Sequence, residues 1–161
     1  MRSRKTASFL AKSAVIAALY VVLTLLSSLF GLSGGIIQLR LSEALCVLPL
    51  FTPAAVPGLF IGCVLANVLT GAVLWDVLFG SAATLLGALG AYFLRNRKPA
   101  LATLPTVLSN TVIVPFVLRY AYGAEGSLLF FAFTVFLGEF VTARLLGVFL
   151  AETLRRHKIE L

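Results

Sequence analysis

Long apolar runs decide what this chain can fold into. The run from Ser8 to Leu29 is interrupted by a single charged residue, Lys12. About 20 apolar residues are enough for a helix to cross the roughly 30 Å hydrocarbon core of a bilayer. The run exceeds the apolar part of a secretory signal peptide, about 7 to 15 residues, and ends without an A-x-A cleavage site. We therefore expect a first transmembrane helix here.

The remaining apolar segments, bounded by turn residues, predict an all-α polytopic membrane protein with six transmembrane helices in one domain, residues 1–161. Its hydrophobic content of 60% exceeds the roughly 45 to 50% of a soluble domain. The second helix, Ala44 to Phe51, would be only about 12 Å long, too short to cross the core alone. The other helices are expected at Pro53 to Thr70, Trp75 to Leu94, Leu101 to Leu118 and Leu128 to Leu150.

The formal charge of +7 arises from basic residues at the ends of apolar runs, so it predicts membrane topology rather than nucleic-acid binding. Six spans place both termini on one side together with the basic loop Arg95 to Pro99. Only three basic residues lie elsewhere, namely Arg40, Arg119 and Arg144. The positive-inside rule then predicts a multi-pass cell-membrane protein with cytoplasmic termini.

The stretch Ile36 to Asn67 carries polar residues into this apolar background. From Ile36 to Ser42 polar and apolar residues alternate, which predicts an extended lip with one polar face. Ser42 is expected to cap the following helix, and Glu43 lies in its first turn. Glu43 is therefore either an ordinary helix-start acid or a binding residue.

Ionisable residues inside a membrane cost at least about 2.5 to 3.5 kcal/mol each and usually mark a site. Asp76 starts the fourth predicted helix, so it too is either a helix-start acid or a ligand. Trp75 beside it is by default an interfacial aromatic. Together with Glu43, the residues expected to surround an outward-facing pocket are Asn67 and Asp76 near the outer side and Asn110 and Glu139 deeper in the membrane.

Small residues form two stripes at helical spacing. Gly58, Gly62 and Ala66 predict a packing face on the third helix. A line of alanines on the first helix similarly permits close approach, either by another helix of this chain or by a partner protein; it comprises Ala7, Ala11, Ala14 and Ala18.

Several kinds of chemistry are not supported. Cys46 and Cys63 lack a CxxC or Cys/His spacing, so no disulfide, metal or other cofactor is expected. The GLSG at Gly31 matches the G-x-S-G of rhomboid-type proteases, but the one histidine, His157, is expected across the membrane from it, which leaves the serine without a base. The sequence contains no GxxxxGK[ST] nucleotide-binding loop. We expect no enzyme and no catalytic residues.

The motifs IIQLRLSEALCVLPLFTPAAVPGLFIGCVLAN and WDVLFGSAATLLGA resemble the queuosine-precursor transporter family, the substrate-binding subunits (S-components) of energy-coupling factor (ECF) importers. The resemblance covers essentially the whole chain. It implies an S-component-like bundle, uptake of a 7-deazaguanine, a transmembrane coupling subunit and two ATPases. In S-components an alanine stripe on the first helix contacts the coupling subunit, and Ala14 and Ala18 match it.

The polar residues suit such a ligand. Ring N–H and amino donors fit a carboxylate, a carbonyl fits an amide or Arg donor, and the ring fits an aromatic face. The expected substrate-binding residues are Gln38, Arg40, Glu43, Asn67, Trp75, Asp76, Asn110 and Glu139, with Tyr20, Tyr120 and Tyr122 as further stacking candidates. An S-component for another vitamin-like ligand, a solitary channel or secondary transporter, and a membrane interaction protein remain alternatives.

Overall fold

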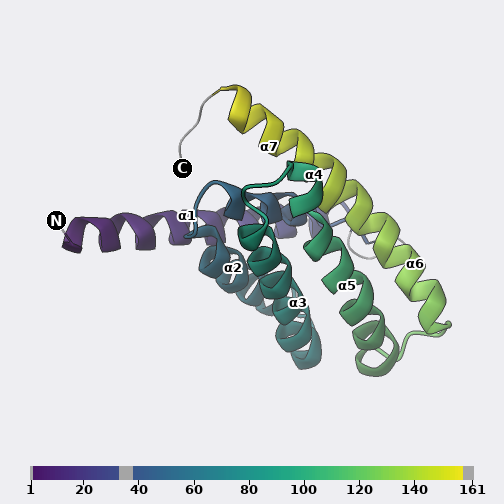
Figure 1. Cartoon of the computed structure of the whole chain (residues 1–161). Helices are drawn as coiled ribbons and strands as arrows, with labels where there is room; N and C mark the ends of the chain where they lie inside the picture. Colours follow the sequence, from purple (N-terminus) through teal and green to yellow (C-terminus); the bar gives the residue numbers. More distant parts are fainter. Residues whose placement is uncertain (1, 33–37, 158–161) are drawn as a thin grey trace.

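The computed structural model describes residues 2–32 and 38–157, which fold as a bundle of helices without a strand in those ranges (Figure 1). Two expectations fall partly outside them: the turn and lip from Ser33 to Ile37, and Lys158 of the basic tail. The helical elements are α1 (Arg2–Leu29), η1 (Leu41–Leu50), α2 (Ala55–Leu69), α3 (Leu74–Phe93), α4 (Pro99–Ala102), α5 (Leu104–Phe116), η2 (Val117–Ala121), α6 (Leu128–Glu139), η3 (Phe140–Leu146) and α7 (Gly147–Arg156).

The predicted all-α fold with six helical segments is confirmed. The fifth segment runs through α4, α5 and η2, and the sixth through α6, η3 and α7. In the part of the chain that the structure describes, four segments are long and apolar enough to span a bilayer: Arg4–Leu29, Leu74–Phe93, Pro99–Ala121 and Leu128–Arg156. The other two, η1 with 10 residues and α2 with 15, are shorter apolar helices. The chain is an integral membrane protein.

The short helix η1 lies at the centre of the bundle, where it contacts α1, α2, α3, α4, α7 and η3. It is a 3₁₀ helix and begins at Leu41, three residues before the predicted start. Arg40, just before it, has the extended backbone expected of the lip. Because η1 is surrounded by other helices, its polar side chains must find partners inside the protein.

The prediction that Ser42 caps this helix is wrong. Arg40 occupies the position before the helix, and its own side chain makes no capping hydrogen bond. Ser42 is fully buried and accepts a hydrogen bond from Thr24 of α1 at 2.8 Å. Ser27 of α1 instead accepts from the Leu41 backbone N–H at 3.0 Å. The first turn of η1 is therefore held by hydroxyl groups of α1.

The packing face predicted on α2 lies against α1 at Gly58 and Gly62. A Cβ atom at Gly58 would lie 2.7 Å from the Ser13 carbonyl oxygen, and one at Gly62 would lie 2.8 Å from Cβ of Tyr20. These contacts are closer than real Cβ atoms tolerate, so glycine is what allows the two backbones to approach. The position of Tyr20 in the bundle follows from this contact.

The alanine stripe on α1 lies on a different face. Ala7, Ala11, Ala14 and Ala18 are all exposed, whereas Ser13, Ile16, Ala17 and Tyr20 are buried against the bundle. The N-terminal part of α1 also extends beyond the neighbouring helices (Figure 1). The alanine stripe is therefore not used for packing within this chain.

The two ends of the bundle differ in the turns they carry. The N-terminus, the turn between α3 and α4 and the end of α7 lie at one end, whereas the turns from α2 to α3 and from η2 to α6 lie at the other (Figure 1). Arg144 of η3 is partly buried and donates a hydrogen bond to the Ala100 carbonyl oxygen of α4 at 2.6 Å. This contact joins the last segment to α4, which follows the basic turn.

Candidate ligand-binding site

Two connected regions of polar side chains lie within the half of the bundle opposite the termini. The inner one is a small enclosed cavity of about 20 Å³ between η1, α5 and α6. It is lined by Gln38, Arg40, Glu43, Asn110, Val114, Val135 and Glu139. Five of the predicted binding residues therefore come together around one cavity, although they come from four separate segments of the chain.

Glu43 is held rigidly in this cavity by donors from three directions. Oε1 accepts a hydrogen bond from the Tyr20 hydroxyl. Oε2 accepts from Nδ2 of Asn110 at 3.4 Å and from Sγ of Cys46 at 3.2 Å. Glu43 is only 2% exposed, so these bonds replace its contacts with water. Its hydrogen-bond partners therefore lie inside the protein, whereas an acid at an exposed helix start would face water.

Glu139 differs from Glu43 in having an unused acceptor. It is the last residue of α6, where the helix passes into the π-helical segment η3, and π segments often occur at functional sites. The side chain is 8% exposed, and no hydrogen-bond donor from the described residues reaches its Oε2. A buried, unpaired acceptor of this kind is unfavourable unless a ligand or water supplies a donor.

A second cluster joins the lip to α2 and α3. Nη1 of Arg40 donates to Oδ1 of Asn67 at 3.4 Å, and Nη2 pairs with Oδ2 of Asp76 at 3.5 Å. Asn67 in turn donates from Nδ2 to the Asp76 carbonyl oxygen at 3.3 Å. Three predicted residues that are far apart in the sequence thus form one hydrogen-bonded group.

Tyr122, just after η2, completes this cluster. Its hydroxyl donates to Oδ2 of Asp76 at 2.9 Å. Partial burial, together with the neighbouring Asp76, raises the pKa of Tyr122 above its ordinary value. The phenol therefore stays protonated throughout the physiological pH range and remains a donor to Asp76.

The outer region is a larger cavity of about 510 Å³, open at the end of the bundle away from the termini. Gln38 and Arg40 line both cavities, so Arg40 stands between the outer opening and the inner carboxylates. The remaining lining residues are Thr24, Ser28, Gly31, Thr70, Gly71, Ala72, Asp76, Leu118 and Tyr122.

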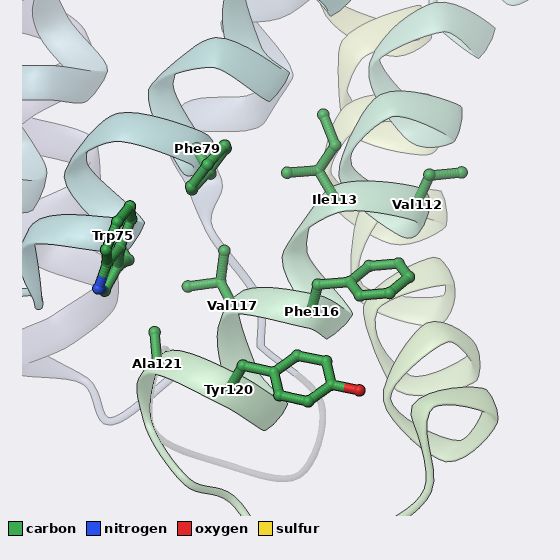
Figure 2. A pocket seen from close by; sticks show the side chains of 8 residues that line it. All are labelled: Trp75, Phe79, Val112, Ile113, Phe116, Val117, Tyr120 and Ala121. Atoms are coloured by element: carbon green, nitrogen blue, oxygen red, sulfur yellow. The ribbon is translucent and has the colours of Figure 1, made fainter.

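Trp75 lies outside both cavities. Although Asp76 beside it is buried, Trp75 is 56% exposed and stacks on Phe79 with ring centroids 5.8 Å apart. Both rings face a groove of about 380 Å³ on the apolar side of α3 and α5 (Figure 2). Tyr120 lines the same groove. The structure therefore places Trp75 and Tyr120, two of the predicted ligand-stacking residues, on the outer surface of the bundle.

The sequence did not predict that tyrosine hydroxyls donate hydrogen bonds to the carboxylates of the site. Tyr20 and Tyr122 were expected as stacking rings, yet both donate hydrogen bonds to carboxylates. Thr24, which was not considered, lies one turn after Tyr20 and lines the outer cavity. The spacing of Tyr20, Thr24 and Ser27 on one face of α1 was the signal for a polar strip.

Acidic side chains outnumber basic ones in the lining of the two cavities taken together. Their lining contains three carboxyl groups, those of Glu43, Asp76 and Glu139, but only one guanidinium group, that of Arg40. Such an arrangement favours a compact ligand rich in hydrogen-bond donors. No cluster of three or more metal-ligating side chains occurs in the part of the chain that the structure describes.

A multi-pass helical bundle with a polar interior cavity reached from one end is typical of membrane proteins that bind or transport small molecules. The family model described as QueT transporter matches residues 10–156. The chain therefore belongs to the QueT transporter family, which confirms the resemblance to queuosine-precursor transporters. The family supports a role in transport.

One similar curated protein is the queuosine precursor transporter QueT of Lactococcus lactis subsp. cremoris (strain MG1363), which is 39% identical over 74 residues. The matched region covers 45% of this chain and 43% of that relative. No solved structure matches this chain.

Proposed function

We propose that this protein is the substrate-binding S-component of an ECF importer and that it carries a queuosine precursor base of the 7-deazaguanine type. Membership of the QueT transporter family supports the transport of a small molecule. The name of the Lactococcus relative supports a queuosine precursor as that molecule. The observation that carries the proposal within this chain is the carboxylate-rich inner cavity beneath Arg40.

The chemistry of the cavity suits the guanine-like edge of such a base. This edge presents a ring N–H and an amino group side by side, which together can donate two hydrogen bonds to a carboxylate. Glu139 offers the free acceptor, because Glu43 is already occupied by donors of the protein. Gln38 and Arg40 provide donors for the carbonyl group on the same ring.

The inner cavity of about 20 Å³ is too small for a bicyclic base, whereas the outer one of about 510 Å³ is large enough. In the proposed complex the base enters from the outer cavity, and Arg40 moves aside so that the two cavities merge. The guanidinium group of Arg40 gives up its hydrogen bonds to Asp76 and Asn67 and donates to the ligand carbonyl instead.

Coupling to ATP hydrolysis requires other polypeptides, since this sequence has no nucleotide-binding loop. The exposed Ala14 and Ala18 give a transmembrane coupling subunit a smooth surface for close helix contact. Two ATPase subunits complete the proposed importer. In the proposed orientation the basic end of the bundle is cytoplasmic, so that the outer cavity faces the medium.

Ligand identification tests the proposal directly. The protein is purified from cells, and molecules released by denaturation are identified by mass spectrometry. The purified protein is also titrated with queuosine precursor bases and with guanine. We expect a 7-deazaguanine to be released and to bind more tightly than guanine. Release of a different vitamin-like compound, with no binding of deazaguanines, would contradict the assigned substrate.

Copurification tests the coupling separately. We expect the tagged protein to retain a membrane subunit and two ATPases from its own cells. Ligand uptake by the protein alone in vesicles, without ATP, would instead identify a solitary transporter.

A further inference from the structure

A second charged pocket lies at the opposite end of the bundle from the ligand site. Here the projecting start of α1 passes over the turn between η1 and α2, leaving a pocket of about 430 Å³. Its lining contains three cationic side chains and no acidic one. The lining residues are Arg4, Lys5, Ser8, Phe9, Lys12, Phe51, Thr52, Pro53 and Ala54.

Among the residues that the structure describes, none of these three cations forms an ion pair. The ion pair found among the described residues is that of Arg40 with Asp76, at the other end of the bundle. Arg4, Lys5 and Lys12 are all exposed. Their combined charge is therefore available to an anion that approaches from outside.

An apolar groove adjoins this pocket. It has a volume of about 410 Å³ and runs between α1, η1 and α7. Lys12 and Thr52 line both the pocket and the groove, so the two adjoin there. The other lining residues are Ala11, Val15, Ile16, Leu19, Leu45, Leu48, Leu150 and Leu154.

We propose that the basic pocket and the apolar groove together bind one anionic phospholipid. The headgroup phosphate lies among Arg4, Lys5 and Lys12, and an acyl chain lies in the groove. Basic pockets next to transmembrane helices at the membrane surface are known sites for anionic headgroups. Lys12 connects the two parts, because its aliphatic stem can follow the groove while its ammonium group reaches the headgroup.

The dimensions of the groove agree with a lipid chain. From Lys12 to Leu19 the helix rises about 10 Å at 1.5 Å per residue, which lies within the roughly 15 Å that one leaflet contributes to the hydrocarbon core. Glu152 does not oppose the headgroup, because it lies two residues from both Leu150 and Leu154 and so on the far side of α7. A zwitterionic lipid offers no net charge to the three cations, so the site should select anionic lipids.

Native mass spectrometry of the purified full-length protein tests the proposal. The protein is titrated with 1-palmitoyl-2-oleoyl phosphatidylglycerol (POPG) and with the matching phosphatidylcholine (POPC). We expect one site that binds POPG at least about tenfold more tightly than POPC, as expected for cations that each favour an anionic lipid surface. The variant Arg4→Gln/Lys5→Gln/Lys12→Gln should reduce this preference to about twofold or less.

The matched control is Arg95→Gln/Arg97→Gln/Lys98→Gln. It removes the same charge from the same end of the bundle, in the turn between α3 and α4, and should keep the POPG preference. The variant Val15→Trp fills the groove from an exposed position and should weaken the binding of both lipids. Circular dichroism melting confirms that each variant is folded before its binding is compared.

Four results would overturn the proposal. Equal binding of POPG and POPC by the parent protein would exclude selection of an anionic headgroup. Equal losses in the two charge variants would show general attraction to the basic end. Equal affinity for POPG and dihexanoyl phosphatidylglycerol, whose chains are short, would remove the groove from the site. Cross-linking of residue 15 to a coupling subunit, with no lipid preference, would assign this surface to a protein.

Discussion

The hydroxyl of Tyr20 in α1 donates a hydrogen bond to Oε1 of Glu43 in η1, and both side chains are almost completely buried. The bond joins the first transmembrane helix to the central short helix. Asn110 of α5 donates to the other oxygen of the same carboxylate. The two bonds together hold one side of the inner cavity. Three helices therefore meet at Glu43.

Replacing Tyr20 with Phe tests the structural value of this bond. The variant removes a buried donor and leaves a Glu43 oxygen unpaired, so we expect the free energy of unfolding in detergent to fall by about 1 to 2 kcal/mol. Denaturant-induced unfolding followed by circular dichroism measures the change. Tyr120→Phe is the matched control, because that ring is exposed on the outer groove, and it should unfold like the parent.

Glu139 and Glu43 should respond differently to the same chemical change. Glu139→Gln alters the carboxylate with the free oxygen, so we expect ligand affinity to fall by about one to two decades with little loss of stability. Glu43→Gln places an amide opposite two or more donors of the protein, so stability should fall as well. Isothermal titration with a queuosine precursor base, paired with thermal melting, separates the two effects. Unchanged affinity in Glu139→Gln would refute its assigned role.

The glycine contact between α1 and α2 gives a prediction with an unusual sign. Alanine normally favours a helix over glycine by up to about 1 kcal/mol. At position 62 its Cβ would lie 2.8 Å from Cβ of Tyr20, so we expect Gly62→Ala to destabilise the protein by about 1 to 3 kcal/mol instead. Thermal unfolding measures this, with Val68→Ala at an exposed position of the same helix as the control. A more stable Gly62→Ala variant would show that the two helices can separate freely.

The exposed alanine stripe should serve coupling but not ligand binding. We expect the double substitution Ala14→Leu with Ala18→Leu to abolish uptake by the assembled importer, since bulky side chains prevent close approach of a partner helix. Ligand affinity of the isolated protein should stay within about twofold of the parent, because both residues face away from the polar cavities. Normal uptake by this variant would exclude the stripe as the coupling surface.

Orientation in the membrane is tested by single cysteines at the two ends of the bundle. Asn96→Cys lies in the basic turn and Glu125→Cys in the turn before α6, and both positions are exposed. A membrane-impermeant maleimide should label position 125 in intact cells and position 96 only after permeabilisation. The reverse pattern would place the outer cavity on the cytoplasmic side and contradict import by the proposed route.

The helical layout was predictable because long apolar runs and basic turns carry strong, local signals. The glycine stripe of α2 was likewise readable, since spacings of four residues define one face of a helix. The start of η1 could not be predicted in the same way. A local rule suggested Ser42 as a cap, but burial of η1 among six other elements turned that serine toward Thr24. Tertiary contacts decided the outcome there.

The candidate site was predictable in composition but not in arrangement. Charged and amide residues in apolar surroundings pointed to Arg40, Asn67 and Asp76, which the fold brings together. Trp75 is adjacent in sequence to Asp76 but faces the outside of α3, because neighbouring helical residues point about 100° apart. Which carboxylate keeps a free oxygen depends on donors from distant helices, so only the structure could distinguish Glu139 from Glu43.

The position of Arg40 between the two cavities has a kinetic consequence. In the proposed complex a ligand reaches Glu139 only in molecules whose Arg40 has left Asp76, so the apparent dissociation constant should exceed the intrinsic one by the reciprocal of that open fraction. Under such conformational selection the observed association rate stops rising at high ligand concentration. Its plateau then equals the frequency with which a single ion pair breaks.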